Sequence, residues 1–258
     1  MRAITFIAFF AFLLQWPSAA FAQDLAMLNS MSVAERISWL VRYNDQELCQ
    51  KDSVTAFRET NELLTLADKW NDPEFAVEVY SGQGKYRLQV LKDPENALRT
   101  LSRGEKFFFV RHLDVCAARL QLQKADVYCK SGQPILAYEN FIRAHNQFSK
   151  IGFSGIPQID QYELAIACFL VSIGDFPTAL DHLAIADLFP GKVSAVQYKI
   201  QLLKAYCYQQ SGRHERVLNC FQKALRLAQK ENDTAKMAAT SVDMGEYYIH
   251  NQDYSEAR

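Results

Sequence analysis

Apolar residues recur along most of the chain with the three- and four-residue spacing of an amphipathic helix. The clearest case is the stretch 201–228, where Val217, Phe221 and Ala224 fall on one helical stripe. Gly212 interrupts this stretch, and a glycine can take the positive φ with which a helix ends. We therefore expect two antiparallel helices here, folded against each other as a hairpin.

The same pattern predicts further helix pairs on both sides of this hairpin. Ser32 and Glu35 have the spacing of a capping box, and Asp72-Pro73 ends the first pair because the residue before a proline leaves the helical region. The predicted pairs are 33–51 with 53–67, 75–90 with 94–110, two helices within 115–148, 159–173 with 177–188, the hairpin 201–228, and an incomplete sixth pair starting at Thr234. No run of alternating apolar residues indicates a strand, so the predicted fold class is all-α.

A small residue opens the second helix of each predicted pair. The intervals between these residues are 41, 40, 42, 38 and 40, and the residues are Ala56, Ala97, Ala137, Ala179, Val217 and Ala257. A period this steady is typical of a solenoid, in which stacked hairpins share one continuous core.

The later copies resemble the tetratricopeptide-repeat (TPR) family. In the last copy Met244-Gly245, Tyr248, Tyr254 and Ala257 match the family's Leu-Gly, Tyr, Tyr and Ala pattern in order and spacing. Earlier copies carry a small, a large and a small residue at the family's spacing: Ala137, Phe141, Ala144; Ala179, Leu183, Ala186; Val217, Phe221, Ala224. Gly132, Gly174 and Gly212 fall where the family places its tight turn. The resemblance covers 32–258 and implies a right-handed superhelix of stacked antiparallel hairpins.

Two departures from the TPR pattern leave an alternative open. The period is near 40 instead of about 34, and HEAT-like repeats share the longer period. The first two copies are weak, since Thr60 and Gly104 stand where the pattern has a large residue and an alanine. The Gly-x-x-Tyr and Ala-x-x-x-Phe-x-x-Ala spacings favour the TPR interpretation.

The resemblance implies a concave groove, lined by the first helices, that binds a protein or peptide. Its candidate residues are Tyr86, Gln89, Arg119, Asp126, Lys130, Leu164, Val171, Lys199, Tyr206, Gln209, Gln210, Glu246 and His250. Charge at the ends and apolar residues in the middle suit an amphipathic or extended peptide. The alternative is an ordinary solvated helix face.

The first 22 residues are typical of a secretory signal peptide. Arg2 precedes the apolar run 4–14, and Ala20-Phe21-Ala22 is a small-x-small cleavage signature before Gln23. An uncleaved anchor is the alternative, but the run is about half of the roughly 20 residues that cross a bilayer. We expect a signal peptide at 1–22 and a repeat domain at 23–258, in the periplasm or on the extracytoplasmic face of a membrane.

Composition and motifs argue against several function classes. The net charge of −1 comes from 28 basic and 29 acidic residues that are dispersed along the chain, so nucleic acid is not an expected partner. The five histidines form no His-x-x-x-His pair, and no CxxC, Gly-x-Ser-x-Gly or phosphate-binding Gly-rich motif occurs. We expect no metal, no cofactor and no catalysis.

An exported chain can form disulfides, which makes the six cysteines relevant. Cys129, Cys168 and Cys207 are 39 residues apart, so they follow the repeat and are expected to be small buried hydrophobes. Cys207 and Cys220 flank the Gly212 turn and could meet, although two thiols are favoured.

The sequence stops one residue after Ala257, within the sixth predicted hairpin. We therefore expect the N-terminal part of a longer polypeptide. An exported TPR array that continues is similar to the sensory region of bacterial membrane signalling proteins, which implies a kinase or DNA-binding output domain downstream. The alternatives are a stand-alone periplasmic scaffold for an envelope complex and, more weakly, a carbohydrate-uptake binding protein.

Overall fold

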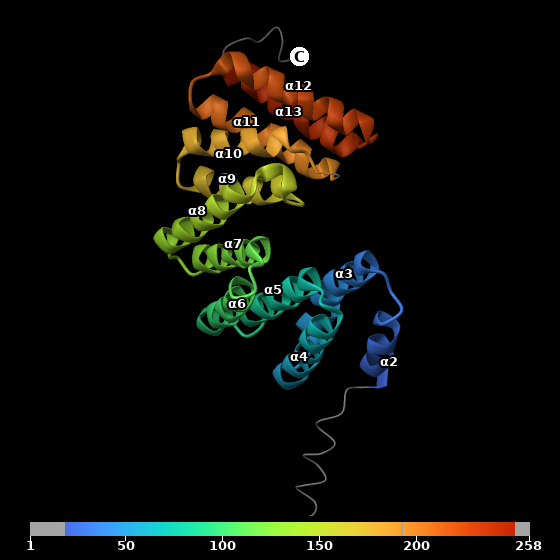
Figure 1. Ribbon diagram of the computed structural model, residues 1–258. Helices are drawn as coiled ribbons and strands as arrows, with labels where there is room; N and C mark the ends of the chain where they lie inside the picture. The colour runs from blue at the N-terminus through green and yellow to red at the C-terminus, as the bar shows by residue number, and fades with distance from the viewer. Residues whose placement is uncertain (1–18, 192, 251–258) are drawn as a thin grey trace, which may run out of the picture. The chain divides into compact units, whose positions relative to one another are not determined.

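The structure is a computed structural model that describes residues 19–191 and 193–250. Twelve α-helices, one π-helical turn and two 3-10 turns account for the regular structure of these residues, which contain no strand. Successive helices run antiparallel (Figure 1). The all-α prediction is confirmed. The chain divides into two compact units, 1–144 and 145–258, and the boundary falls inside α8.

The first unit is built around α5. Its helices are α2 (Ala19–Leu28), α3 (Val33–Arg42), α4 (Ser53–Trp70), α5 (Pro73–Gln89), α6 (Pro94–Phe109), α7 (Asp114–Lys130) and the first part of α8 (Pro134–Ile151). A π-helical turn (Tyr43–Glu47) and a 3-10 turn (Leu48–Gln50) prolong α3, so helical structure ends at Gln50, one residue before the predicted end. Helix α5 packs against α3, α4, α6 and α7.

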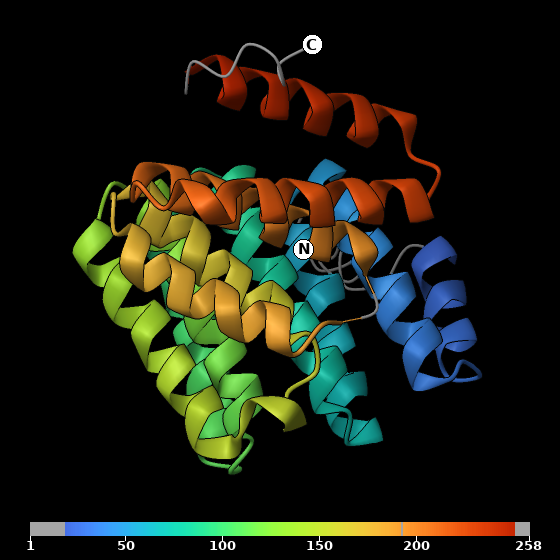
Figure 2. The ribbon, with the colours of Figure 1, turned by 90° about the horizontal axis from the view of Figure 1, so that it is seen from above.

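The second unit continues the same alternation. It contains the end of α8, a 3-10 turn (Phe153–Gly155), α9 (Ile159–Ser172), α10 (Phe176–Leu188), α11 (Ser194–Gln210), α12 (His214–Lys230) and α13 (Thr234–His250). Each of α9 to α13 packs against the next, and α9 also contacts α11. Figure 2 shows α12 and α13 running alongside each other.

The small residues that define the repeat lie in the core wherever the structure describes them. Ala56, Ala97, Ala137, Ala179 and Val217 are each 0 or 1% exposed, and Ala257 lies outside the described residues. The residues four and seven positions later are also inside, because a stripe with this spacing faces the preceding helices. The repeat inferred from the sequence is therefore the packing repeat of the structure.

The two unusual residues of the weak first copies, Thr60 and Gly104, each have a packing reason. The Thr60 hydroxyl donates to the Ala56 carbonyl at 2.7 Å and accepts from the Gln83 side chain at 2.8 Å. A Cβ on Gly104 would lie 2.6 Å from Leu120 and 2.7 Å from the Tyr80 ring, so even alanine would force α6 away from its neighbours. Thr60 and Gly104 therefore occupy the buried positions of the repeat, although their side chains differ from those of the family pattern.

Local signals at helix ends are confirmed. The Ser32 hydroxyl and amide donate to the Glu35 carboxylate at 2.7 and 2.8 Å, and these two hydrogen bonds lower the pKa of Glu35. The Glu35 amide donates back to the Ser32 hydroxyl, which completes the capping box. Gly132, Gly174 and Gly212 have φ values of 70°, 82° and 68°, which glycine adopts without strain. The sequence therefore identified these helix boundaries from chemistry that the structure contains.

The predicted signal peptide at 1–22 lies mostly outside the residues that the structure describes. Residues 1–18 lie outside the described residues, and the predicted cleavage after Ala22 falls inside α2. Phe21 is 2% exposed, with its ring centroid 6.1 Å from that of Tyr43. Cleavage stays a prediction, and it would remove this aromatic contact. Within the described residues, no helix combines the length and the apolar character needed to span a membrane.

Candidate functional site

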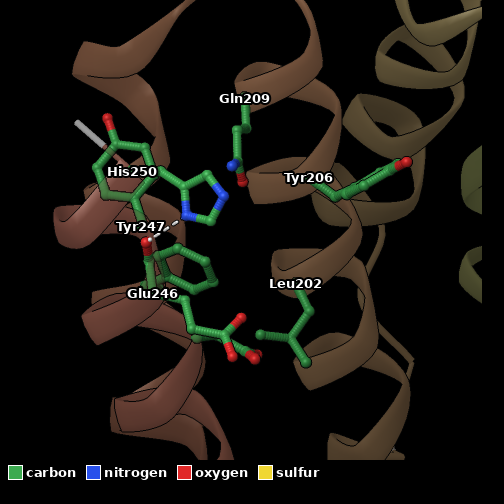
Figure 3. A pocket seen from close by; sticks show the side chains of 8 residues that line it. Leu202, Tyr206, Gln209, Glu246, Tyr247 and His250 are labelled. Atoms are coloured by element: carbon green, nitrogen blue, oxygen red, sulfur yellow. Dashed lines mark hydrogen bonds between the residues drawn. The ribbon is translucent and has the colours of Figure 1, made fainter.

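A pocket of about 260 Å³ opens in the second unit between α11, α12 and α13 (Figure 3). Its lining residues are Leu202, Tyr206, Gln209, Phe221, Asp243, Glu246, Tyr247 and His250. In the figure, Leu202 and Gln209 of α11 lie on the side that faces Glu246, Tyr247 and His250 of α13, whereas the Tyr206 side chain extends toward the other side of α11. Helices α11 and α13 are the first helices of successive hairpins, the helices that the TPR resemblance expects to line a groove.

The floor of the pocket is apolar and firmly held. Phe221 is buried and its ring centroid lies 6.4 Å from that of Tyr247, with Leu202 packed against the same cluster. The Tyr247 hydroxyl donates to the His214 carbonyl at 3.2 Å, which fixes the ring against the start of α12. An apolar side chain of a ligand would find a preformed surface here.

The rim of the pocket is acidic and more accessible. Asp243 and Glu246 lie one helical turn apart on α13, and burial together with the negative charge of Glu246 raises the pKa of Asp243. His250 donates from Nδ1 to the Glu246 carbonyl at 3.0 Å, and Tyr206 is 45% exposed on the opposite helix. The arrangement offers two carboxylates to a positively charged group, while the Tyr206 ring packs edge-on against Phe176 with 5.9 Å between the ring centroids.

Four predicted groove residues, Tyr206, Gln209, Glu246 and His250, line this pocket. The other predicted residues of the second unit do not belong to it. Lys199 and Gln210 are exposed elsewhere on α11, while Leu164 and Val171 are half-buried on α9.

The first unit does not bring its predicted residues to one site. Tyr86 is 4% exposed and its hydroxyl donates to the Lys51 carbonyl at 2.8 Å, so its assignment to an exposed groove is wrong. Gln89 is exposed at the end of α5, and Lys130 pairs with Asp126 on its own helix at 2.6 Å. Arg119 has a structural role instead, because it pairs with two carboxylates of α5.

Arg119 ties α7 to α5 through two carboxylates. Its guanidinium pairs with Glu74 and, at 2.5 Å, with Glu78, and its side chain is 13% exposed. Planar guanidinium groups suit such two-carboxylate contacts. The predicted binding residue is therefore occupied by an ion-pair network between neighbouring first helices.

The same polar contact occurs between a second helix and the next first helix in both units. In the first unit, Glu105 of α6 accepts from Gln121 at 2.9 Å and from Lys124 at 2.8 Å, both on α7. In the second unit, Asp187 of α10 accepts from Gln201 at 2.8 Å and Lys204 at 2.7 Å on α11. We call these two sets of three residues the carboxylate–glutamine–lysine triads.

Midway in sequence between the two triads, the corresponding contact of α8 with α9 holds a cluster that was not predicted from the sequence. His145 lies 40 residues after Glu105 and 42 before Asp187, and Glu163 lies 42 after Gln121 and 38 before Gln201. Here His145 and His182 both contact Glu163. Glu163 lies 18 positions after His145 and 19 before His182, so no short motif contains the cluster, whereas alignment of the repeats would have paired these residues.

All six cysteines are free thiols. Cys207 is buried as expected, but Cys129 is only half-buried and Cys168 is exposed, so the predicted burial of all three is wrong for Cys168. Cys207 and Cys220 are both buried without being bonded, in line with the favoured pair of thiols. Burial raises the pKa of Cys207 to about 11, which makes it a poor nucleophile.

Comparison with known proteins gives structural neighbours only. No family model and no curated protein matches the sequence. BtubC (BKLC) from P. vanneervenii has a TM-score of 0.64 at 17% identity, over 88% of this chain and 87% of its own. A signal transduction ATPase with numerous domains from Pyrococcus horikoshii, which has a tetratricopeptide repeat sensor, gives 0.63 at 13% identity, over 93% and 38%.

A third neighbour has nearly identical TPR-like repeats, in a Podosopora anserina kinesin light chain, with a TM-score of 0.53 at 13% identity over 78% of this chain and 97% of that one. At such identities the likeness concerns the fold. Together with the buried repeat stripe and the positive-φ glycine turns, it shows that the chain has the fold of a tetratricopeptide-repeat array.

Proposed function

We propose that the chain binds a protein partner through the pocket between α11, α12 and α13, and that the bound segment carries an apolar side chain next to a basic one. TPR-type arrays generally serve protein interaction, which supports a binding role. The observation that carries the proposal is the combination of an apolar floor with the carboxylates of Asp243 and Glu246 on the rim. A basic residue would complement the rim, and its apolar neighbour would fill the floor.

The size of the pocket supports a peptide over a free small molecule. Small-molecule sites usually measure about 300 to 1,000 Å³ and enclose most of the ligand. This pocket has about 260 Å³ and is open along the helices, so it would accommodate one side chain of a longer segment. The remainder of the segment would follow the exposed face of α11, where Lys199 and Gln210 lie.

Selection of peptides from a random displayed library on the full chain tests this proposal. We expect the selected peptides to share Lys or Arg beside Leu, Ile or Phe. Fluorescence anisotropy should then show at least tenfold weaker binding of a selected peptide to Glu246→Lys, because the substitution places like charges together. The matched control Asp181→Lys changes the charge equally at an exposed position of α10 and should leave affinity unchanged. Selected peptides without a basic residue, or equal affinity for both variants, would overturn the proposal.

We further propose that the array is the extracytoplasmic sensory part of a larger signalling protein. The leader-like residues 1–22 support export, and the Pyrococcus horikoshii neighbour combines such repeats, as a sensor, with signal transduction. A partner in the pocket would change the packing of α11 against α13, and that change would be passed along the array. The downstream reading frame tests this role: a membrane span followed by an output domain supports a sensor, whereas a stop supports the stand-alone scaffold.

Export can be tested at the N-terminus itself. The mass of the mature protein from the producing cell should correspond to a chain that begins at Gln23. An intact residue 21 in that protein would contradict cleavage after Ala22.

Phe21 provides an independent check on export. The middle position of a small-x-small signature tolerates any residue, so Phe21→Ala leaves cleavage unaffected. The exported Phe21→Ala protein should therefore melt at the wild-type temperature. If residue 21 is retained, loss of this buried ring should lower the free energy of unfolding by about 3 kcal/mol, as core Phe→Ala substitutions do.

A further inference from the structure

The cluster of His145, Glu163 and His182 joins three consecutive helical elements of the second unit. His145 Nδ1 lies 3.0 and 3.3 Å from the two oxygens of Glu163, and His182 Nδ1 lies 2.5 Å from Glu163 Oε2. The two imidazole rings are 4.6 Å apart between centroids. The Glu163 side chain is 0% exposed, His182 is 6% and His145 is 21%. The cluster is thus interior, with one edge open at His145.

The charge of Glu163 is compensated differently from that of the related carboxylates. Glu105 and Asp187 each pair with a lysine in the carboxylate–glutamine–lysine triads. Within the described part of the chain, the only cationic or imidazole groups that pair with Glu163 are His145 and His182. A fully buried carboxylate needs a compensating positive charge. Imidazole nitrogens beside a carboxylate are groups that a metal ion can use as ligands.

We propose that His145, Glu163 and His182 form a binding site for a divalent transition-metal ion, with Zn²⁺ as the best match. The donor set of two imidazole nitrogens and one carboxylate oxygen is one that zinc uses, and it suits calcium or magnesium poorly because these prefer oxygen ligands. One ligand atom from each residue lies within 4.8 Å of the other two. Zinc bonds of about 2.0 to 2.2 Å hold tetrahedral ligands about 3.3 to 3.5 Å apart, so side-chain shifts below about 1 Å create the site.

Metal binding exchanges one set of bonds for another. Without an ion, each Nδ1–H donates a hydrogen bond to Glu163. With an ion, each Nδ1 donates its lone pair to the metal, and a neutral imidazole carries its proton on Nε2. Three protein ligands leave the fourth position to water or to an incoming group. His145 is the most exposed of the three ligands, and its imidazole lies 5.4 Å from the Phe153 ring between centroids.

The site would connect the end of α8 to the hairpin of α9 and α10, so a bound ion would stabilise this part of the second unit. This inference does not depend on the peptide pocket, because no residue is shared between the two sites. A loss of metal binding and a loss of peptide binding can therefore be measured separately.

Titration of the chelator-treated full chain tests the site directly. In competition with a chromophoric chelator, we expect one Zn²⁺ per chain, bound with micromolar or tighter affinity. Co²⁺ should give the intense visible bands of four-coordinate cobalt without a thiolate charge-transfer band, because no cysteine is a ligand. Zn²⁺ should also raise the melting temperature, since it binds the folded state selectively.

Three single variants and one control decide the outcome. His145→Gln, Glu163→Gln and His182→Gln should each weaken Zn²⁺ binding at least tenfold, whereas the control His112→Gln should bind like the wild type. His145 is partly exposed, so its variant is expected to fold even if a substitution at the buried positions prevents folding; circular dichroism checks this. Absence of Zn²⁺ binding by the wild type, a cobalt spectrum with thiolate bands, or undiminished binding by His145→Gln would overturn the proposal.

Discussion

The two carboxylate–glutamine–lysine triads place the same chemistry in different units of the chain. Glu105, Gln121 and Lys124 belong to the first unit, and Asp187, Gln201 and Lys204 to the second, with hydrogen bonds of 2.7 to 2.9 Å in both. In each, the second helix supplies the acid and the next first helix supplies the amide and the lysine. A buried amide requires a hydrogen-bond partner. The two units therefore share this hydrogen-bonding arrangement as well as the apolar stripe.

The His145–Glu163–His182 cluster, at the contact of α8 with α9, reverses this arrangement. Glu163 puts the carboxylate on the first helix, and His145 puts the base on the preceding second helix. Ile166 stands where the triads have lysine, so no ammonium group is available from that position. The comparison teaches that polar partners occupy this contact at all three places, although the residues that supply them differ. Where the identities change, the same geometry acquires the donor atoms of a metal site.

The largest expected effect comes from removing the carboxylate of this cluster. In the metal-free chain, Glu163→Gln should lower the free energy of unfolding by about 2 to 4 kcal/mol, because two imidazoles lose a charged acceptor in the interior. Urea denaturation followed by circular dichroism measures the change. A loss below about 0.5 kcal/mol would mean that the buried carboxylate contributes no net stability.

The double variant His145→Asp with Glu163→Gln tests whether the contacts are truly equivalent. It places an aspartate on α8 opposite a glutamine on α9, and so copies the pairing of Asp187 with Gln201. We expect it to recover at least 1 kcal/mol relative to Glu163→Gln alone, since the amide then donates to a carboxylate. A double variant no more stable than the single one would break the equivalence.

A smaller and equal effect is expected at the lysines of the two triads. The Lys124 and Lys204 side chains are both 12% exposed, and their partners are 22% and 28% exposed. Lys124→Met and Lys204→Met should each cost about 1 kcal/mol, because solvent screens these pairs in part. The control Lys130→Met breaks an exposed pair and should cost about 0.3 kcal/mol. Different losses at the two triads, measured by urea denaturation, would show that the units use the contact differently.

The fold was predictable because the repeat is defined by residue spacing within each helix and by the glycines at the turns. The spacing from Ala179 to Leu183 to Ala186 requires one buried helical stripe, and a glycine such as Gly174 is compatible with the positive φ of the turn. Tyr86 shows the limit of such reasoning. Its helix face follows from the repeat, but its burial depends on the Lys51 carbonyl of the preceding hairpin, which no periodicity describes.

The sites were less predictable because they combine residues from several helices. Transfer from the TPR pattern found Tyr206 and Glu246, whereas the apolar floor at Phe221 comes from a second helix, which that transfer did not consider. The cluster at Glu163 was hidden for another reason. Metal motifs are usually recognised within one helix or loop, and here three elements contribute one ligand each.

The smallest effect concerns reactivity and leaves stability unchanged. Cys116 in the first unit and Cys207 in the second are both buried, and burial raises the pKa of each thiol to about 11. At pH 8 only about one molecule in a thousand then carries the thiolate that reacts, so both should label slowly and at similar rates with an aromatic disulfide reagent. The exposed Cys49 should label first. Because the pKa values are raised, the slow rates should increase about tenfold per pH unit between pH 8 and 10. Unfolding without reductant should release all six thiols, whereas a count of four would reveal a disulfide and end the comparison of two equally protected thiols.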